Sequence, residues 1–200
     1  MARKEGLFVV LEGIDGSGKS TQLNLLKNAL QKEGYEVITT SEPTKEKLGV
    51  ILRDYLSNPS SIPFADALLF AADRVEHYYE FIEPQLEKGK IVISDRYTAS
   101  SIVYQGSMDV PKEWIKEINK MSPPAQLTFY IEISVDVALE RLSVSKRSHL
   151  EKFENREYLL KIIKNYEEIE GLSKVPGELG EDYITDFMVN IIRGKMKENI

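Results

Sequence analysis

A glycine-rich turn between a short apolar run and a helical pattern constrains this chain more than any other stretch. Gly13, Gly18, Lys19 and Ser20 fall at the spacing G-x-x-x-x-G-K-[ST], in which backbone N–H groups of the turn and of the following helix wrap a polyphosphate. The preceding apolar residues 8–11 are typical of a buried parallel strand, and apolar residues recur at helical intervals after the turn. The sequence therefore predicts a strand, a phosphate-binding loop and a helix in succession.

The residue types in this loop suit the phosphates of ATP. Glycines permit backbone angles and a close approach that a Cβ would prevent, Lys19 can reach the β- and γ-phosphates, and the Ser20 hydroxyl can ligate Mg²⁺. A chance match is expected in about one chain of this length in a hundred or fewer, so we favour this interpretation over a glycine loop with a stray lysine. The candidate ATP ligands are Gly13, Ile14, Asp15, Gly16, Ser17, Gly18, Lys19, Ser20, Thr21 and Arg141.

Composition limits the class of protein. Two hundred residues with 42% hydrophobic content suit one globular domain, residues 1–200. The absence of cysteine excludes a disulfide framework, thiol catalysis and cysteine metal sites, and favours the cytoplasm. A formal net charge of −6 argues against sequence-independent binding to nucleic acid. The apolar run near the N-terminus is too short for a signal sequence and none is long enough to span a membrane, so we expect neither nucleic-acid nor membrane partners.

Strand and helix patterns alternate along the rest of the chain. Further strands are expected at 35–40, 90–94 and 127–133, and helices at 48–56, 64–86, 100–106, 111–120, 135–142 and, as the last long one, 155–172. Residues 173–180 contain proline and glycine and are expected to form a loop. The alternation predicts a three-layer α/β fold with a mostly parallel sheet of about five strands and helices on both faces.

The strand expected at 90–94 is followed directly by Asp95. An apolar strand that ends in aspartate has the Walker B arrangement, in which the carboxylate emerges beside the phosphate loop and holds Mg²⁺ directly or through water. We therefore expect Ser20 and Asp95 to hold the Mg²⁺ that accompanies ATP.

Residues 143–155 differ from the segments around them. They have few large apolar residues, are rich in serine, and carry three cations, Lys146, Arg147 and Lys152. A solvated basic loop is one interpretation. In a phosphate-binding enzyme, the alternative is a lid that brings positive charge onto a transferring phosphoryl group.

Taken together, the motifs resemble those of the thymidylate kinase family of P-loop kinases, which transfer the ATP γ-phosphoryl group to dTMP. Asp15 lies where the family has an acidic residue inside the phosphate loop. The stretches similar to further family motifs, between about residues 8 and 172, are FAADR at 70–74, DRY at 95–97, SS at 100–101, YQG at 104–106 and EKFE at 151–154. The resemblance implies a P-loop kinase fold with a lid at about 143–155, and phosphorylation of dTMP to dTDP for dTTP synthesis.

The resemblance also implies how the acceptor is bound. Phe70 would stack on the thymine ring and Arg74 would approach the base and the acceptor phosphate, although core packing is an alternative for Phe70 taken alone. Arg53 and Arg96 would grip the dTMP phosphate, because a guanidinium matches two phosphate oxygens at once. A surface salt bridge is the alternative for Arg53.

Sugar and base contacts follow from the same resemblance. Asp15 would hold the 3′-hydroxyl group, and Tyr104 would crowd the 2′ position and so favour deoxyribose. Ser101 and Gln105 are candidate base contacts. No catalytic role is expected for the two histidines, which we interpret as solvated: His77 and His149.

A phosphate oxygen is already an adequate nucleophile, so no Ser-His type base is needed and none is visible. Catalysis is expected from positioning and charge stabilisation by Asp15, Lys19, Mg²⁺, Arg96 and the lid cations. Some family members carry a catalytic arginine in the phosphate loop after the acidic residue, but this chain has Gly16 there. We therefore expect the lid to supply it, in the order Arg147, Lys146 and Lys152.

The chain departs from the family pattern at three places. Ser41 stands where many members have an arginine before the Glu-Pro turn, and Lys152 replaces the usual arginine of the lid. Residues 181–200 do not show the strand and loop that usually help to hold adenine, so the donor base preference stays open.

Two other functions stay open. The chain could phosphorylate another nucleoside monophosphate or a nucleoside, or it could be a nucleotide-gated regulatory ATPase. A GTPase version of the latter is disfavoured because Asn119-Lys120-Met121-Ser122 lacks the aspartate of a guanine-reading N-K-x-D motif. The resemblance alone implies a homodimer.

Overall fold

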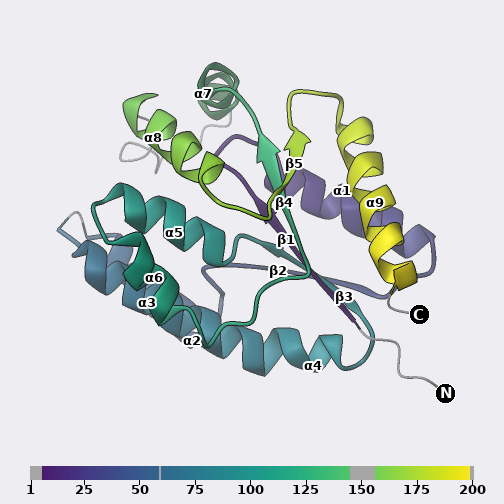
Figure 1. Ribbon diagram of the computed structural model, residues 1–200, viewed down its shortest axis with the longest axis horizontal. Coiled ribbons are helices and arrows are strands. Elements are labelled where there is room, and N and C mark those ends of the chain that lie inside the picture. The colour runs from purple at the N-terminus through teal and green to yellow at the C-terminus, as the bar shows by residue number, and fades with distance from the viewer. Residues whose placement is uncertain (1–5, 59, 145–155, 199–200) are drawn as a thin grey trace.

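A computed structural model describes residues 6–58, 60–144 and 156–198, and within them one five-stranded, all-parallel sheet with the strand order β2-β3-β1-β4-β5. The strands are β1 (Leu7–Glu12), β2 (Val37–Ser41), β3 (Ile91–Asp95), β4 (Leu127–Glu132) and β5 (Ser173–Pro176). Helices cover both faces of the sheet (Figure 1). This confirms the predicted three-layer α/β class.

The helical elements of the described residues connect these strands in sequence. They are α1 (Lys19–Lys32), α2 (Lys47–Leu56), α3 (Pro63–His77), the π-helical turn η1 (Tyr78–Ile82), α4 (Glu83–Leu86), α5 (Thr98–Ser107), α6 (Lys112–Ile118), α7 (Val135–Val144), α8 (Arg156–Glu167) and α9 (Glu181–Glu198). In Figure 1, α1 and α9 lie together on one side of the sheet and α4, α5 and α8 lie on the other. None of the helices in these ranges has the length and apolar character needed to cross a bilayer.

Strand β1 is buried on both faces because its residues alternate between two layers of core. Leu7, Val9 and Leu11 pack toward α1 and α9, in a cluster that includes Leu26 and Met188. On the opposite face, Phe8 and Val10 pack with residues of η1 and of β3. A continuous apolar run is what a central parallel strand requires.

The long helix predicted for 64–86 is helical throughout but not uniformly α-helical. It contains a π turn at Tyr78–Ile82, and Pro84 is the second residue after that turn. Pro84 has no N–H group to donate to the carbonyl of residue 80, and wider turns are a common way to accommodate such a gap.

The C-terminal part of the sequence analysis was wrong in two respects. Residues 173–180 were predicted to be a loop, but Ser173–Pro176 forms the edge strand β5, where a terminal proline is tolerated. The helix predicted for 155–172 ends at Glu167, and it is not the last one, because α9 follows. Buried residues of α9 recur at helical spacing, namely Ile184, Met188, Ile192 and Met196.

The strand register brings three chain segments to one edge of the sheet. Leu11 and Ser41 are both paired with Asp95, so the carboxyl ends of β1 and β2 lie on either side of the carboxyl end of β3. In open parallel sheets, ligands bind in the crevice at this edge.

Candidate active site

The loop between β1 and α1 closes tightly on itself and on β4. Gly13 has a φ of +152°, and a Cβ built there would lie 2.7 Å from the Ser17 hydroxyl oxygen and 2.9 Å from the Ile131 carbonyl oxygen. Gly16 has a φ of +81°, and its Cβ would meet the Ala138 carbonyl oxygen at 2.8 Å. Both positions therefore require glycine on conformational and steric grounds.

Lys19 is held at the centre of this loop. Its Nζ donates to the carbonyl oxygens of Gly13 and Ile14, at 2.9 Å each, and the side chain is buried. Burial lowers the pKa of Lys19 to about 8, while the carboxylates of Asp95 and Asp15 oppose that shift. A cation that is partly desolvated and held only by neutral carbonyls is well prepared to receive a phosphate.

Ser20 and Asp95, the two residues expected to share a metal ion, are in contact. The Ser20 hydroxyl donates to Asp95 Oδ2 at 3.1 Å, and the other carboxylate oxygen, Oδ1, is buried with no hydrogen-bond partner among the described residues. A buried carboxylate oxygen without a donor fits a cation ligand. Within the described ranges, no cluster of three or more His, Cys, Asp or Glu side chains is arranged to hold a metal alone.

A cavity of about 400 Å³ opens over this loop. Arg141 from α7 reaches it and donates to the carbonyl oxygens of Gly16, at 3.3 Å, and of Gly177, at 3.1 Å. Ile14 instead buries its side chain in the core with α5 and α8 and offers only its backbone. The cavity is lined by Asp15, Gly16, Gly18, Lys19, Ser20, Thr21, Ser41, Glu42, Asp95, Arg96, Arg141 and Leu142.

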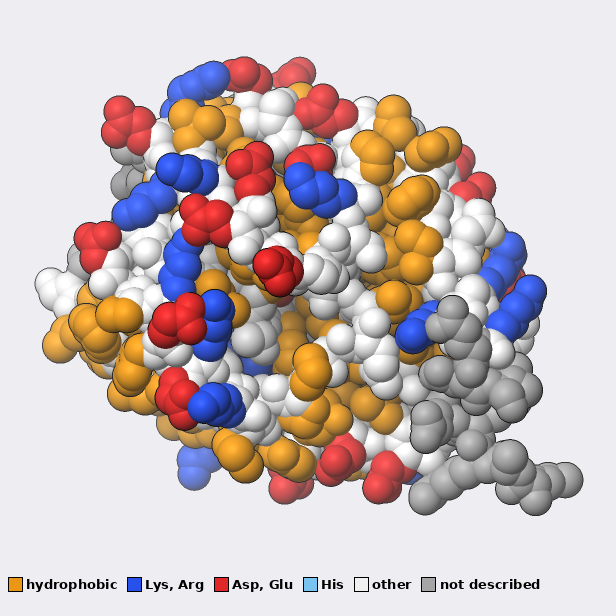
Figure 2. Space-filling view, viewed as in Figure 1, with side chains coloured by type: hydrophobic (Ala, Val, Ile, Leu, Met, Phe, Trp, Pro, Cys, Tyr) orange, Lys and Arg blue, Asp and Glu red, His pale blue; other side chains and the backbone are white. Residues whose placement is uncertain are grey.

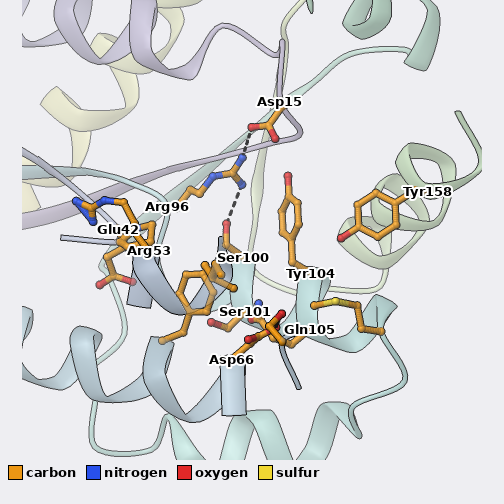
Figure 3. Close-up of a pocket in the computed structure, with 15 residues that line it drawn as sticks. Asp15, Glu42, Arg53, Asp66, Arg96, Ser100, Ser101, Tyr104, Gln105 and Tyr158 are labelled. Carbon is orange, nitrogen blue, oxygen red and sulfur yellow. Dashed lines mark hydrogen bonds and ion pairs between the residues drawn. The ribbon is translucent and has the colours of Figure 1, made fainter. Parts of the chain in front are cut away.

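A second cavity of about 550 Å³ adjoins the first and is more apolar. Figure 3 shows its side chains converging from the phosphate loop, α2, α3, α5 and α8. It is lined by Asp15, Glu42, Pro43, Arg53, Leu56, Ser61, Asp66, Phe70, Arg96, Ser100, Ser101, Tyr104, Gln105, Met108 and Tyr158. Seven of the residues predicted to bind the acceptor are among them: Asp15, Arg53, Phe70, Arg96, Ser101, Tyr104 and Gln105.

Arg96 lies where the two cavities meet. Its guanidinium donates to Asp15 Oδ1 at 2.7 Å, to the Ser100 hydroxyl at 3.1 Å and to the Gly13 carbonyl at 3.2 Å (Figure 3). Its Cζ also lies over the Tyr104 ring, 4.8 Å from the centroid, a cation–π contact. Asp15, Glu42 and Arg96 line both cavities.

The second cavity holds buried polar atoms that have no partner among the described residues. The Ser101 hydroxyl and Gln105 Oε1 are buried without a hydrogen bond to any described residue. Burial raises the pKa of the Tyr104 phenol, which therefore stays neutral. Buried polar atoms left open in a cavity are suited to hydrogen bonding with a bound ligand.

Arg53 reaches the cavity from α2 and is anchored by the backbone. Its Nη1 donates to the Thr44 carbonyl and, at 2.9 Å, to the Gly49 carbonyl. This is not the surface salt bridge considered as an alternative, because the described residues offer it no acidic partner within ion-pair distance.

Arg74 lies elsewhere than its predicted role requires. It is 1% exposed and lines neither cavity. Nε donates to Glu42 Oε2 at 2.8 Å, Nη1 to Asn119 Oδ1 at 2.5 Å and Nη2 to the Tyr97 carbonyl at 3.2 Å. With every nitrogen of its guanidinium engaged inside the protein, Arg74 supports the wall of the site and does not face a ligand.

His77 is not solvated, contrary to the sequence interpretation. It is 5% exposed, with Nδ1 3.1 Å from Glu42 Oε1 and Nε2 2.7 Å from the Thr40 hydroxyl. A helix pattern with interspersed charges gave no sign of this burial, because the partners come from β2 and from the turn after it.

Sequence reasoning missed several residues that line the second cavity. Asp66 lies one helical turn before Phe70, so its spacing placed it on the same face. Tyr158 arrives from α8, and nothing in its local sequence signalled the cavity. The remaining missed residues of interest are Glu42 and Met108. The predicted lid cations, Lys146, Arg147 and Lys152, lie outside the described residues, as does His149.

Comparison with known proteins gives one family. The sequence model of the thymidylate kinase family matches residues 11–174. A "probable thymidylate kinase" of Caldivirga maquilingensis is 44% identical over 163 residues, which cover 80% of this chain and 78% of that protein. One from Pyrobaculum aerophilum is 42% identical over 160 residues, covering 80% of each chain.

A third relative extends the similarity toward the C-terminus. The "probable thymidylate kinase" of Methanosphaera stadtmanae is 39% identical over 194 residues, which cover 93% of this chain and 97% of that protein. The family match spans the phosphate loop, the two cavities and the segment between α7 and α8. The chain therefore belongs to the thymidylate kinase family.

Proposed function

We propose that this protein transfers the γ-phosphoryl group of ATP to dTMP and so produces dTDP and ADP. The observation that carries the proposal is the pair of adjoining cavities that share Asp15, Glu42 and Arg96. One holds a phosphate loop with its lysine, and the other is an apolar pocket with a few buried polar atoms, as a nucleobase requires. Donor and acceptor phosphates would meet beside Arg96.

In this reaction an oxygen of the dTMP phosphate attacks the γ-phosphorus of ATP, and the bond from that phosphorus to the β,γ-bridging oxygen breaks. The described residues contribute position and charge. Lys19 would contact the donor phosphates, and Arg96 would hold the acceptor phosphate in line. No general base is needed, because the attacking oxygen carries no proton at neutral pH.

The residues present fit a magnesium ion bound with ATP. Ser20 and Asp95 would hold it, because Asp95 Oδ1 is a buried oxygen without a donor in the part of the chain that the structure describes, and hard oxygen ligands suit this metal. When bound, Mg²⁺ would neutralise charge on the donor phosphates.

Within the acceptor cavity, Phe70 would stack on thymine, and Ser101 and Gln105 would bond to its edges. Tyr104 would crowd the 2′ position and Asp15 would meet the 3′-hydroxyl group. Arg53, fixed to the carbonyl groups of Thr44 and Gly49, would be a second contact for the acceptor phosphate.

We further propose that residues 1–200 act as one kinase domain with a lid at about 143–155, and that the lid supplies the catalytic cation. Arg147 is the first choice, ahead of Lys146 and Lys152. Replacing Arg147 by Ala should lower kcat by about a hundredfold and leave ATP binding little changed. A kcat near that of the wild type would rule out this assignment. The cytoplasmic location expected from the sequence stays a prediction.

A homodimer is also proposed, with α2 and α3 at its interface. Val50 and Ile51 on α2 and Phe64 and Leu68 on α3 are 45–56% exposed, and Figure 2 shows apolar side chains gathered over the end of the molecule where these helices lie. Leu68→Glu should shift the sedimentation coefficient to that of a monomer. Leu160→Glu, at an equally exposed leucine of α8, is the matched control and should not.

The decisive experiment is a coupled assay of ADP release at fixed Mg-ATP, with dTMP, dUMP, UMP and thymidine as acceptors. Turnover highest with dTMP is the expected result. Highest turnover with another acceptor would keep the phosphate loop and overturn the base pocket. Hydrolysis that does not depend on any acceptor would favour a nucleotide-gated ATPase.

A further inference from the structure

Glu12, the last residue of β1, holds a buried carboxylate that the proposed reaction does not use. It is 0% exposed and lines neither cavity. Its Oε1 accepts from the backbone N–H groups of Tyr97, at 2.9 Å, and Ser100, at 3.2 Å. Its Oε2 accepts from the hydroxyl groups of Ser100, at 2.6 Å, and Tyr166, at 2.9 Å. All of these donors are neutral.

The donors surround a turn whose backbone is strained. Arg96 has a φ of +75°, a left-handed conformation that is uncommon for residues other than glycine. Such a conformation persists only where the surroundings hold it from several sides. The Arg96 N–H donates to the Leu11 carbonyl at 2.9 Å, and the Arg96 carbonyl accepts from the Ser94 hydroxyl at 2.8 Å.

The backbone of the next residue, Tyr97, is held by two buried ionisable side chains. Glu12 accepts from the N–H of Tyr97, and Arg74 donates to its carbonyl at 3.2 Å. Glu12 thus fixes the turn from β1 while Arg74 fixes it from α3.

Glu12 is also linked to the Arg96 side chain through the hydroxyl oxygen of Ser100. The Ser100 hydroxyl donates to Glu12 Oε2 and, at 3.1 Å, accepts from Arg96 Nη1. The other terminal nitrogen of Arg96 donates to Asp15 (Figure 3). The backbone turn at Arg96 and the hydrogen bond to Ser100 together orient the Arg96 guanidinium at the junction of the two cavities. Glu12 accepts hydrogen bonds from both the turn and Ser100.

We propose that Glu12 is a positioning residue for phosphoryl transfer: it holds the left-handed turn at Arg96 and orients Ser100, so that the Arg96 guanidinium faces the acceptor phosphate. This inference rests on the proposed function. The competing explanation is that Glu12 serves only to stabilise the end of β1.

Glutamine at this position separates the two explanations. Its amide oxygen can still accept from the N–H groups of Tyr97 and Ser100, so the fold should survive. Its amide NH₂ group, however, must donate to the hydroxyl groups of Ser100 and Tyr166, which reverses those hydrogen bonds. The Ser100 oxygen would then accept from both the amide and Arg96 Nη1, and its hydroxyl would lose the carboxylate that now orients it, so its contact with Arg96 would change.

The test compares Glu12→Gln with Glu132→Gln, a matched control at the carboxyl end of β4 whose side chain is half exposed and paired with Lys174. For Glu12→Gln we expect kcat to fall by about a hundredfold, as misplacement of a positioned group can cause, with a higher KM for dTMP and a KM for ATP within about threefold of the wild type. The control should keep wild-type values. If Glu12→Gln loses thermal stability but keeps kcat and both KM values, the proposal is overturned.

A crystal structure of Glu12→Gln provides a readout that does not need the reaction. We expect the Arg96 guanidinium to lose its contact with Asp15, and the backbone φ of Arg96 to move out of the left-handed region. An unchanged Arg96 would overturn the positioning role even if activity fell. If the wild type does not turn over dTMP, the proposed function fails, whereas the displacement of Arg96 in this variant still decides whether Glu12 positions it.

Discussion

Glu12 and Glu42 are both buried carboxylates at the carboxyl edge of the sheet, yet their partners differ in charge. From residues 6–58, 60–144 and 156–198, Glu12 receives only neutral N–H and O–H donors. Glu42 lies 2.8 Å from Arg74 Nε and 3.1 Å from His77 Nδ1, and the Glu42 and Arg74 side chains are 2% and 1% exposed. One carboxylate organises a turn, and the other compensates a buried cation.

Because of this difference, we expect Glu42 to matter mainly for stability and Glu12 mainly for activity. Burial raises the pKa of Glu12, and the hydrogen bonds from Ser100 and Tyr166, together with the charge of Arg96, oppose that shift without cancelling it. Keeping Glu12 ionised therefore costs free energy. Such a cost is consistent with a carboxylate whose role is to position other groups. Glu42 and Arg74 neutralise each other, so removing Glu42 leaves Arg74 as an unpaired buried charge.

The largest effect should follow from breaking the Glu42 pair. Glu42→Gln should lower the free energy of unfolding by about 3–5 kcal/mol, because Arg74 is left buried without a counter-ion. Urea unfolding measures it, and Glu46→Gln, at an exposed glutamate four residues further on, serves as the control. A loss below about 1 kcal/mol would mean that Asn119 and the Tyr97 carbonyl suffice to hold Arg74.

Removing both charges should cost less than removing one. In the double variant Glu42→Leu with Arg74→Met, no charge is left unpaired, so part of the stability lost in Glu42→Leu should return, with a coupling of about 0.5–3 kcal/mol in a double-mutant cycle. Strictly additive losses would contradict the view that the two side chains act as one neutral pair.

The pH dependence of kcat should depend on Glu12. Because its pKa is raised, Glu12 takes up a proton at a higher pH than an ordinary glutamate, and kcat should fall as the pH falls through that pKa. The groups facing it are Tyr97, Ser100, Tyr166 and Arg96. The free energy of unfolding should change in the opposite direction. Because the folded state binds this proton more tightly than the unfolded state, Glu12 contributes most to stability at low pH and less as the pH rises.

Glu12→Gln mimics the protonated side chain, so it is the control for the acid limb, the decrease in kcat at low pH. Its kcat should be low at every pH and should lack the acid limb, whereas Glu132→Gln should retain it. An acid limb that persists in Glu12→Gln would have to come from another group.

The residues proposed to bind the donor could be predicted from the sequence, and those proposed to bind the acceptor only in part. Lys19 and Ser20 were predictable because the loop and the following helix position them locally. Asp95 was predictable because the end of a buried parallel strand positions it. Arg96 and Tyr104 came from the resemblance to a family and not from any local rule.

The rest depends on contacts between distant segments. Arg74 was predicted to contact the ligand from its place in a sequence motif, but a motif does not give the direction of a side chain. That direction is determined by Glu42 and Asn119, which are 32 and 45 residues away in the chain. His77 is buried for the same reason. Strand β5 was missed because an edge strand with proline and few apolar residues resembles a loop.

The smallest effect in this comparison should come from Tyr166→Phe. The variant removes one neutral donor from Glu12 Oε2 and keeps the ring that stacks on Tyr130, with centroids 4.6 Å apart and planes at 21°. Ser100 still donates to the same oxygen, so we expect a loss of about 1 kcal/mol in unfolding free energy and a decrease in kcat much smaller than that of Glu12→Gln. A decrease as large as that of Glu12→Gln would show that Tyr166, on the helix after the proposed lid, sets the orientation of Ser100, and the positioning role would then belong to Tyr166 as much as to Glu12.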